Sequence, residues 1–433
     1  MLQRLFHLDE RNTSVRIEIT AGLTTFMTMA YIIVVNPSIL HTIPGLYHAR
    51  ASLAAATCLA AAIPTIMMGL FTNTPYALAP GLGLSGVLAY TVCARNGVPW
   101  TTAMGIVVIE GLIIALLVVT RTQQAVVQAI PLDLKRAFAA GIGLYLTYLG
   151  LAQSQITRLR YSYGDIAKST IHNPAVLLGV LALVVTTMLY VRKVRGSFLI
   201  GIAITTLVSL TADTTHLPIT NQPFVLPHFG TLFYANVLDA LKPGLWATIL
   251  AFVMSDFFGA IGTVVGVGQR AGLVDANGDI PGLRNILLVN SFAAIWGGFC
   301  GTSSSSTYVE SATGVAEGGR TGLTAVVVGI LFLLAMFATP LVRIIPAQAT
   351  APALIIVGFL MLSTVTYIDW GNVETALPAF ITIIGISTSY SIATGIGLGF
   401  IMYVIIMAVR GKLMKVHPIL LVIAVLFLLS FLF

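Results

Sequence analysis

The chain has 433 residues, of which 57% are hydrophobic and only 9% are charged. Soluble domains carry about 25% charged residues, so this composition excludes an ordinary soluble protein and predicts a chain that crosses the membrane many times. The formal net charge of +7 comes from basic residues at the ends of apolar runs, a pattern typical of membrane topology. We therefore expect membrane lipid around the protein and no nucleic-acid partner.

Apolar runs long enough to form spanning helices nearly fill the sequence. Runs of about 17–25 apolar residues suffice, and they predict an all-α polytopic membrane protein with about fourteen segments, seven on each side of a polar connection at 213–243. Seven is an odd number, so the second half is inverted relative to the first, as in transporters built from inverted repeats. The predicted segments are 17–40, 51–71, 77–93, 100–120, 137–153, 174–191, 197–212, 245–267, 285–300, 302–313, 322–345, 349–368, 377–388 and 391–409.

The distribution of basic residues predicts the orientation of these segments. With the N-terminus in the cytoplasm, 15 of the 22 lysines and arginines lie on the inner side, as the positive-inside rule requires. No cleavable signal peptide is visible in the polar start, residues 1–16. We expect a multi-pass protein of the cell (inner or plasma) membrane. The last apolar stretch, 419–433, is either a fifteenth helix or lies along the interface.

The third and tenth predicted segments are interrupted in a way that ordinary spanning helices are not. Residues 77–93 contain Pro80 and several glycines, and residues 301–313 contain four consecutive serines at 303–306. Backbone at membrane depth is irregular only where protein or a water-filled cavity satisfies its hydrogen bonds. A matched pair of such broken segments marks the binding site of many secondary transporters. We expect the substrate between these two stretches.

Four acidic residues at or near membrane depth stand out, because buried charges are costly and are usually functional. Asp256 lies in the middle of the eighth predicted segment, and Glu310 follows the serine run. Glu110 lies in the middle of the fourth segment, where a neutral acid bonded to backbone is the structural alternative. Glu18 stands near the inner end of the first segment, and we expect it at the membrane interface.

Residues 81–86 formally match the GxGxxG fingerprint of dinucleotide-binding proteins. That fingerprint requires a preceding strand, a following helix and an acidic residue about 20 positions later, whereas here the flanking segments are apolar spans. We interpret the glycines as positions where backbone N–H groups approach a ligand. The cysteines and histidines lack the spacing of a metal site. No cofactor, no metal and no enzymatic activity are expected.

Several longer motifs resemble one known family. They are TAGLTTFMTMAY (20–31), VNP (35–37), ALAPG (77–81), GTS (301–303), TYVES (307–311) and GVAEGGRTGLTA (314–325). They resemble the nucleobase–cation symporter-2 (nucleobase/ascorbate transporter) family, and within it the adenine/guanine/hypoxanthine permease branch. The resemblance extends from about Phe6 to the C-terminus, and the motif around Glu310 is its most specific part.

The resemblance implies a core domain formed by residues 1–133 and 244–346. It also implies a gate domain formed by residues 134–243 and 347–433, including the C-terminal apolar segment. The implied activity is import of a purine nucleobase (adenine, guanine or hypoxanthine) by elevator-like movement of the core. Protons are the implied coupling ion, with sodium as the alternative. For the oligomeric state, a homodimer and a monomer are both compatible with the resemblance.

Two positions depart from the family pattern, and both alter chemistry that faces the ligand. Gly259 stands where the family usually has Asp, and Ser85 where Asn is common. Asp256 lies three residues before Gly259, on the same helix face, and is predicted to point at the same cavity. The exact base therefore stays open.

A purine is flat and neutral and is rimmed by donors and acceptors, so its site needs apolar faces and a few polar groups. Glu310 is predicted to accept from its N–H groups, with Asp256 nearby. Asp256 is also the predicted proton carrier, and Glu110 is the second choice. The other predicted substrate contacts are Ser85, Gly83, Thr307 and Tyr308 from the broken segments, and Phe26, Phe257 and Phe258, for which bundle packing is the alternative.

Three other classes of protein were weighed against this interpretation. A channel usually repeats rings of charge or carbonyl groups around a symmetric pore. An intramembrane enzyme needs a metal or nucleophile motif, and none lies in the predicted segments. A transporter of the same fold for xanthine, uracil or a small anion is the main alternative, although intramembrane carboxylates repel an anion.

Overall fold

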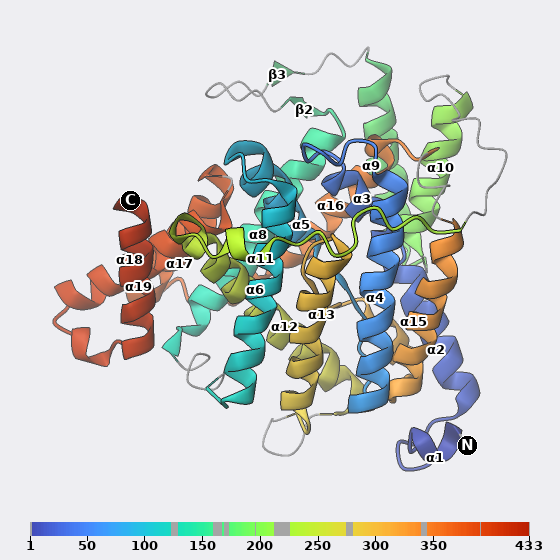
Figure 1. Cartoon of the computed structure of the whole chain (residues 1–433), viewed down its shortest axis with the longest axis horizontal. Helices are drawn as coiled ribbons and strands as arrows, with labels where there is room; N and C mark the ends of the chain where they lie inside the picture. Colours follow the sequence, from blue (N-terminus) through green and yellow to red (C-terminus); the bar gives the residue numbers. More distant parts are fainter. Residues whose placement is uncertain are drawn as a thin grey trace.

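The computed structural model describes residues 2–122, 129–158, 167–168, 173–194, 196–211, 226–273, 280–338, 344–389 and 391–432. In these ranges the molecule is a bundle of helices with two very short two-stranded sheets (Figure 1). Eight of the described helical segments are long and apolar enough to cross a membrane, and shorter apolar helices accompany them. This confirms the predicted helical membrane protein.

The first half of the chain follows the predicted order of segments. Its elements are α1 (Leu2–Leu5), α2 (Val15–Met29), α3 (Ile32–Leu40), α4 (Arg50–Thr72), β1 (Leu78–Pro80), α5 (Leu82–Gly86), the π-helix η1 (Val87–Arg95), α6 (Trp100–Val119), α8 (Leu132–Gln153), β2 (Thr157–Arg158), β3 (Ala167–Lys168), α9 (Pro174–Val191) and α10 (Ser197–Thr211).

The second half begins after a connection that lies partly outside the described residues. Its elements are α11 (Val237–Ala240), η2 (Pro243–Leu245), α12 (Trp246–Ala271), α13 (Leu283–Cys300), β4 (Ser305–Thr307), α14 (Ser311–Ala316), α15 (Gly322–Ala335), α16 (Ala347–Leu362), η4 (Ser363–Tyr367), α17 (Val373–Ser389), α18 (Ile392–Val409), η5 (Leu413–Lys415) and α19 (Pro418–Leu432).

Several predicted segments differ from the structure; for example, the segment 137–153 is longer than predicted, because α8 starts at Leu132. The segment 17–40 is not one continuous helix, because a tight turn separates α2 from α3 and places Tyr31 at the break. The segment 377–388 is longer than predicted, because α17 starts at Val373. Pro378 lies inside α17, past its first turn, and its missing N–H group removes one backbone hydrogen bond of the helix.

The helices pack in two groups. In one group α4 packs against α13 and α15, and α6 against α13; in the other α8 packs against α16 and α17. Glycines bring the backbones of two of these pairs together: a β-carbon on Gly322 would lie 1.9 Å from the carbonyl oxygen of Gly69, and one on Gly143 would lie 2.5 Å from that of Gly358. Small residues at contacts are the usual means of close helix packing in membranes.

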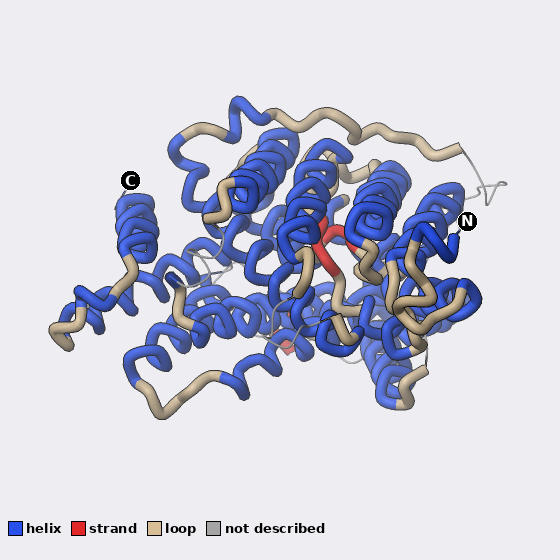
Figure 2. Tube along the Cα trace, turned by 90° about the horizontal axis from the view of Figure 1, so that it is seen from below, coloured by secondary structure: helices blue, strands red, loops and turns tan. Residues whose placement is uncertain are grey.

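The two interrupted segments cross each other inside the first group. Strands β1 and β4 pair antiparallel, with Leu78 opposite Thr307 and Pro80 opposite Ser305. Figure 2 shows the two strands, in red, enclosed by helices. Each strand leads into a short helix, α5 or α14. The two stretches therefore satisfy each other's backbone groups, as irregular backbone at membrane depth requires, and the predicted breaks are confirmed.

Glu18 corrects the expectation of an interface residue, because its side chain is fully buried. Its Oε1 accepts from the backbone N–H of Arg320 at 2.9 Å, and its Oε2 accepts from the backbone N–H of Thr324 at 3.2 Å and from the Thr324 hydroxyl at 2.5 Å. The first N–H groups of a helix have no partner within it and attract a carboxylate. Glu18 of α2 thus caps the N-terminus of α15.

Candidate functional site

Glu310 lies immediately before α14, at the end of the second broken segment. The hydroxyl of Tyr31 donates to its Oε1 at 2.7 Å. Tyr31 itself comes from the break between α2 and α3 and is 1% exposed, whereas Glu310 is only half-buried. Two interruptions of regular helix thus meet at one carboxylate that retains exposed surface. Tyr31 belongs to a motif that carried the family resemblance, although sequence reasoning did not assign it to the site.

Aromatic side chains from two other helices extend this region. The ring of Phe198 in α10 lies 4.8 Å from the ring of Tyr31, and the ring of Tyr190 in α9 lies 5.9 Å from that of Phe198, measured between centroids. Tyr190 also interacts electrostatically with Glu310. Neither residue was predicted, because both stand at the ends of unbroken apolar segments and the sequence carries no signal there.

The three phenylalanines predicted as substrate faces pack elsewhere against the bundle. Phe26 meets the edge of Phe332 in α15 at 5.1 Å, and Phe257 has no exposed surface. Phe258 is partly exposed, and the ammonium group of Lys135 lies 5.4 Å from its ring centroid. Three tyrosines, Tyr31, Tyr190 and Tyr308, interact with Glu310. Phe198 packs against Tyr31.

Ser85 belongs to a buried polar network that joins both broken segments. Its hydroxyl lies 2.6 Å from Oδ1 of Asn36 and 2.5 Å from the hydroxyl of Ser303. The amide of Asn36 donates to Thr57 at 2.8 Å and to Thr302 at 2.7 Å. Because every polar atom of Asn36 is occupied by protein, this network holds the crossing together rather than facing open space.

Tyr308 and Thr307 also lie at the crossing. The Tyr308 hydroxyl donates to the carbonyl oxygen of Pro80 at 2.6 Å, and the backbone N–H of Thr307 donates to Oδ1 of Asn290 at 3.0 Å. Gly83 lies against α8, where an added β-carbon would be 2.8 Å from a methyl group of Ile142. The first two residues therefore fix β4 in place, and the third lets α5 approach α8 closely.

Asp256 and Glu110 form a second region of buried carboxyl groups. Oδ2 of Asp256 accepts from Asn290 at 3.3 Å, and Oε1 of Glu110 accepts from the Ser304 hydroxyl at 3.1 Å. Asp256 is 3% exposed and Glu110 is fully buried. The bond to Ser304 corrects the structural alternative for Glu110, because its partner is a side chain of the serine run and not backbone.

Gly259 and Asp256 do not share an environment, in contrast to the expectation from their spacing. Gly259 is exposed, and an added β-carbon there would meet no atom within 4 Å. Asp256 is buried against α13 through its bond to Asn290. One turn of α12 thus separates a position beside open space from a position inside the bundle.

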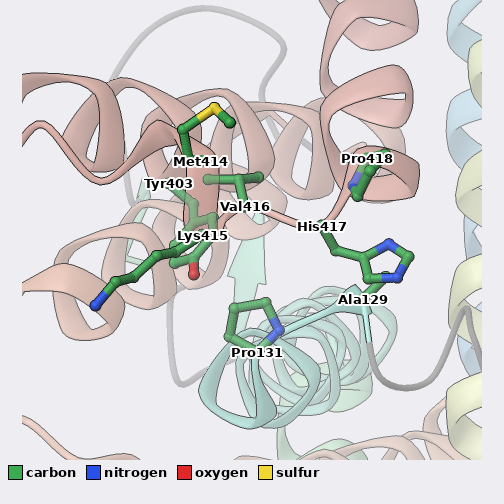
Figure 3. A pocket seen from close by; sticks show the side chains of 8 residues that line it. All are labelled: Ala129, Pro131, Tyr403, Met414, Lys415, Val416, His417 and Pro418. Carbon is green, nitrogen blue, oxygen red and sulfur yellow. The ribbon is translucent and has the colours of Figure 1, made fainter.

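A shallow cavity of about 530 Å³ lies away from these residues (Figure 3). It is found between the start of α8 and the connection from α18 to α19, and it contains none of the predicted site residues. Its lining consists of Ala129, Pro131, Tyr403, Met414, Lys415, Val416, His417 and Pro418.

The carboxyl groups at the crossing have no cationic partner in the described part of the chain. None of its ion pairs includes Glu110, Asp256 or Glu310. Two broken segments that cross inside a bundle of apolar helices, with acidic side chains around the crossing, define a secondary transporter of the membrane.

The comparison with protein families names that transporter class. The Permease family model (Xan_ur_permease) matches residues 16–398. The chain belongs to this family, the nucleobase/ascorbate transporters. It is a permease and not an enzyme.

Two curated relatives match the chain along its whole length. Adenine permease AdeP of Escherichia coli (strain K12) is 38% identical, over 100% of this chain and 96% of the relative. Guanine/hypoxanthine permease PbuG of Bacillus subtilis (strain 168) is 40% identical, over 100% of both chains.

Solved structures confirm the fold independently. The transmembrane domain of the cyanobacterial bicarbonate transporter BicA superimposes with a TM-score of 0.63 at 17% identity, covering 86% of this chain and 96% of that domain. Murine Slc26a9, an anion transporter in the inward-facing state, gives a TM-score of 0.64 at 12% identity, covering 91% of this chain and 68% of that one. At such low identity the likeness concerns the fold alone.

Proposed function

We propose that the protein imports a purine nucleobase, of the adenine, guanine or hypoxanthine type, across the cell membrane by proton symport. The observation that carries the proposal is the half-buried Glu310 carboxylate, held by Tyr31 where two chain breaks meet. The full-length similarity to adenine and guanine/hypoxanthine permeases supports this substrate class.

The chemistry around Glu310 suits a neutral, flat base. A carboxylate accepts hydrogen bonds from ring and exocyclic N–H groups of a purine, and a flat ring gains from aromatic neighbours. Tyr31 and Phe198 supply such rings beside the carboxylate. In the proposed site Glu310 binds the edge of the base, and these rings bind its face.

The proposed architecture has fourteen segments in two inverted repeats, with the N-terminus in the cytoplasm. The core consists of residues 1–133 and 244–346, and the gate of residues 134–243 and 347–433. The helix pairs α4–α15 and α6–α13 fall within the proposed core, and the pairs α8–α16 and α8–α17 fall within the proposed gate. Elevator-like movement of the core past the gate would carry the crossing, and Glu310 with it, between the two sides of the membrane.

Asp256 is the proposed proton carrier, with Glu110 as the second carboxyl group at membrane depth. An anion carrier is the alternative, because the fold is shared with a bicarbonate transporter. The absence of ion pairs to Glu310 among the described residues argues against it, since an anion needs a positive partner when it leaves water.

Uptake of labelled adenine and hypoxanthine into a host that lacks its own purine permeases tests the proposal. We expect saturable uptake that unlabelled purines inhibit, that pyrimidines and bicarbonate leave unchanged, and that collapses when a protonophore is added. Uptake that follows a sodium gradient and persists with the protonophore would disprove proton coupling. Inhibition by bicarbonate and not by purines would disprove the substrate class.

A further inference from the structure

Glu110 and Asp256 approach the serine run from two different helices, α6 and α12. The Ser304 hydroxyl donates to Glu110 at 3.1 Å, and the Ser306 side chain lies beside Asp256. Alternate residues of an extended chain point to the same side. The two carboxyl groups therefore lie on one side of the strand, and they interact electrostatically with each other.

In each carboxyl group, one oxygen accepts a hydrogen bond and the other has no hydrogen-bond partner among the described residues. Oε2 of Glu110 and Oδ1 of Asp256 are buried and have no hydrogen-bond partner in the described part of the chain. Two ionised carboxylates in this position would repel each other and lose their hydration without compensation. A single proton between them removes one charge and turns an unpartnered acceptor into a donor.

Three other ionisable groups on or beside the surrounding helices have partners of their own. Lys135 of α8 has its ammonium group over the ring of Phe258, and Arg284 of α13 donates to the carbonyl oxygens of Val118 and Val119. Glu310, ahead of α14, accepts from Tyr31. Neither cation acts on Glu110 or Asp256, so a proton is the available source of compensating charge.

We propose that Glu110 and Asp256 form one site that binds a single transported proton between their unpartnered oxygens. This inference rests on the proposed proton symport and deepens it. The proton enters from the outer side, bonds to one carboxylate oxygen, donates to the other carboxyl group, and leaves to the cytoplasm. The O–H bond of the protonated carboxyl group is the one covalent bond that forms and breaks during transport.

The serine run connects this site to the substrate site. Asn290 donates to Asp256 and accepts from the backbone N–H of Thr307, the last residue of β4. Glu310 follows three residues later. Loss of the proton increases the demand of both carboxylates for donors, and the nearest donors are on or beside β4. Protonation then changes the free energy of purine binding by the same amount as purine binding changes the free energy of protonation, as linkage requires.

The experiment uses purified full-length protein in two assays. In liposomes with an acid exterior we measure purine accumulation and purine exchange. In weakly buffered detergent solution, a pH dye measures proton uptake when adenine is added.

The wild type should take up about one proton per bound purine. Glu110→Gln and Asp256→Asn should each take up none and lose acid-driven accumulation at least about tenfold, while exchange persists. The double variant should be no worse than either single one, because the two groups act as a unit.

Proton uptake by Glu110→Gln equal to that of the wild type would overturn the shared site, as would losses that multiply in the double variant. The detergent assay needs binding only, so it decides the question even for a variant that no longer transports. Wild-type protein that binds no purine at all would instead refute the proposed function. The two failures are therefore distinguishable.

Ser304 provides the matched test of a positioning role. Ser304→Ala removes the donor to Glu110, and we expect the pH dependence of purine affinity to shift; Ser304→Thr, which keeps the hydroxyl, should restore it. Ser305→Ala is the control, because the buried Ser305 hydroxyl has no partner among the described residues. An unchanged pH dependence in Ser304→Ala would contradict the connection through the serine run.

Discussion

The two carboxyl regions beside the crossing differ in exposure and in the elements that surround them. Glu310 is half-buried, is held by Tyr31, and lies beside rings from α9 and α10. Glu110 and Asp256 are buried, and their partners among the described residues are the serine run and Asn290 of α13. Glu310 retains some exposed surface, whereas the other two carboxyl groups retain almost none. In the proposed function, the first region binds the base and the second binds the proton, and β4 joins them.

The largest expected effect concerns Glu310 itself. Glu310→Gln replaces an acceptor by a donor at the edge of the base, and a mismatched buried hydrogen bond costs about 1–3 kcal/mol. Purine affinity should fall about tenfold to hundredfold, measured by calorimetry on purified protein, while expression and melting temperature stay near the wild type. Wild-type affinity in this variant would show that the accessible carboxylate does not bind the substrate.

Tyr31→Phe tests how the carboxylate is held. The change removes the donor at 2.7 Å from Glu310, and a hydrogen bond to a charged group contributes about 1.5–3 kcal/mol. Purine affinity should fall about tenfold. Tyr190→Phe is the matched control, because the Tyr190 hydroxyl interacts with Glu310 only electrostatically and forms no hydrogen bond to it in the described part of the chain. The affinity of this variant should stay within about twofold of the wild type. Equal losses in both variants would refute the specific role of the Tyr31 hydroxyl.

Phe198→Ala tests whether the gate contributes a face to the base. Aromatic pairs contribute about 0.5–1.5 kcal/mol beyond their buried area, so affinity should fall about threefold to tenfold. Phe292→Ala removes a ring that stacks on Trp296 at 6.2 Å, away from Glu310, and serves as the control. Unchanged affinity in Phe198→Ala, measured by the same calorimetry, would place the base entirely within the core.

The smallest effect on transport is expected at Glu18. Glu18→Ala leaves the first N–H groups of α15 without their carboxylate, and losing such a cap costs about 0.5–2 kcal/mol. The melting temperature should drop, while purine affinity stays unchanged, because Glu18 contacts neither carboxyl region. Glu10→Ala, at an exposed position near the N-terminus, should leave both properties alone. A loss of affinity without a loss of stability would connect Glu18 to the site.

Local sequence was sufficient to predict the two broken segments and to single out the acidic residues around them. Pro80 with its neighbouring glycines, and the serine run, are incompatible with ordinary spanning helices, so the broken segments were predicted and β1 and β4 confirm them. Glu110, Asp256 and Glu310 were found because acidic residues are rare and costly among apolar runs. These signals come from the composition of short windows and do not depend on what lies beside them in space.

The partners of these residues were decided only by the tertiary structure. Tyr31 and Glu310 are 279 residues apart in the chain, and Ser304 and Glu110 are 194 apart. No periodicity relates such pairs, because their contact arises from the crossing of two segments in different halves of the fold. For the same reason Glu18 looked like an interface residue. Its burial depends on the start of α15, which becomes its neighbour only when the helices pack.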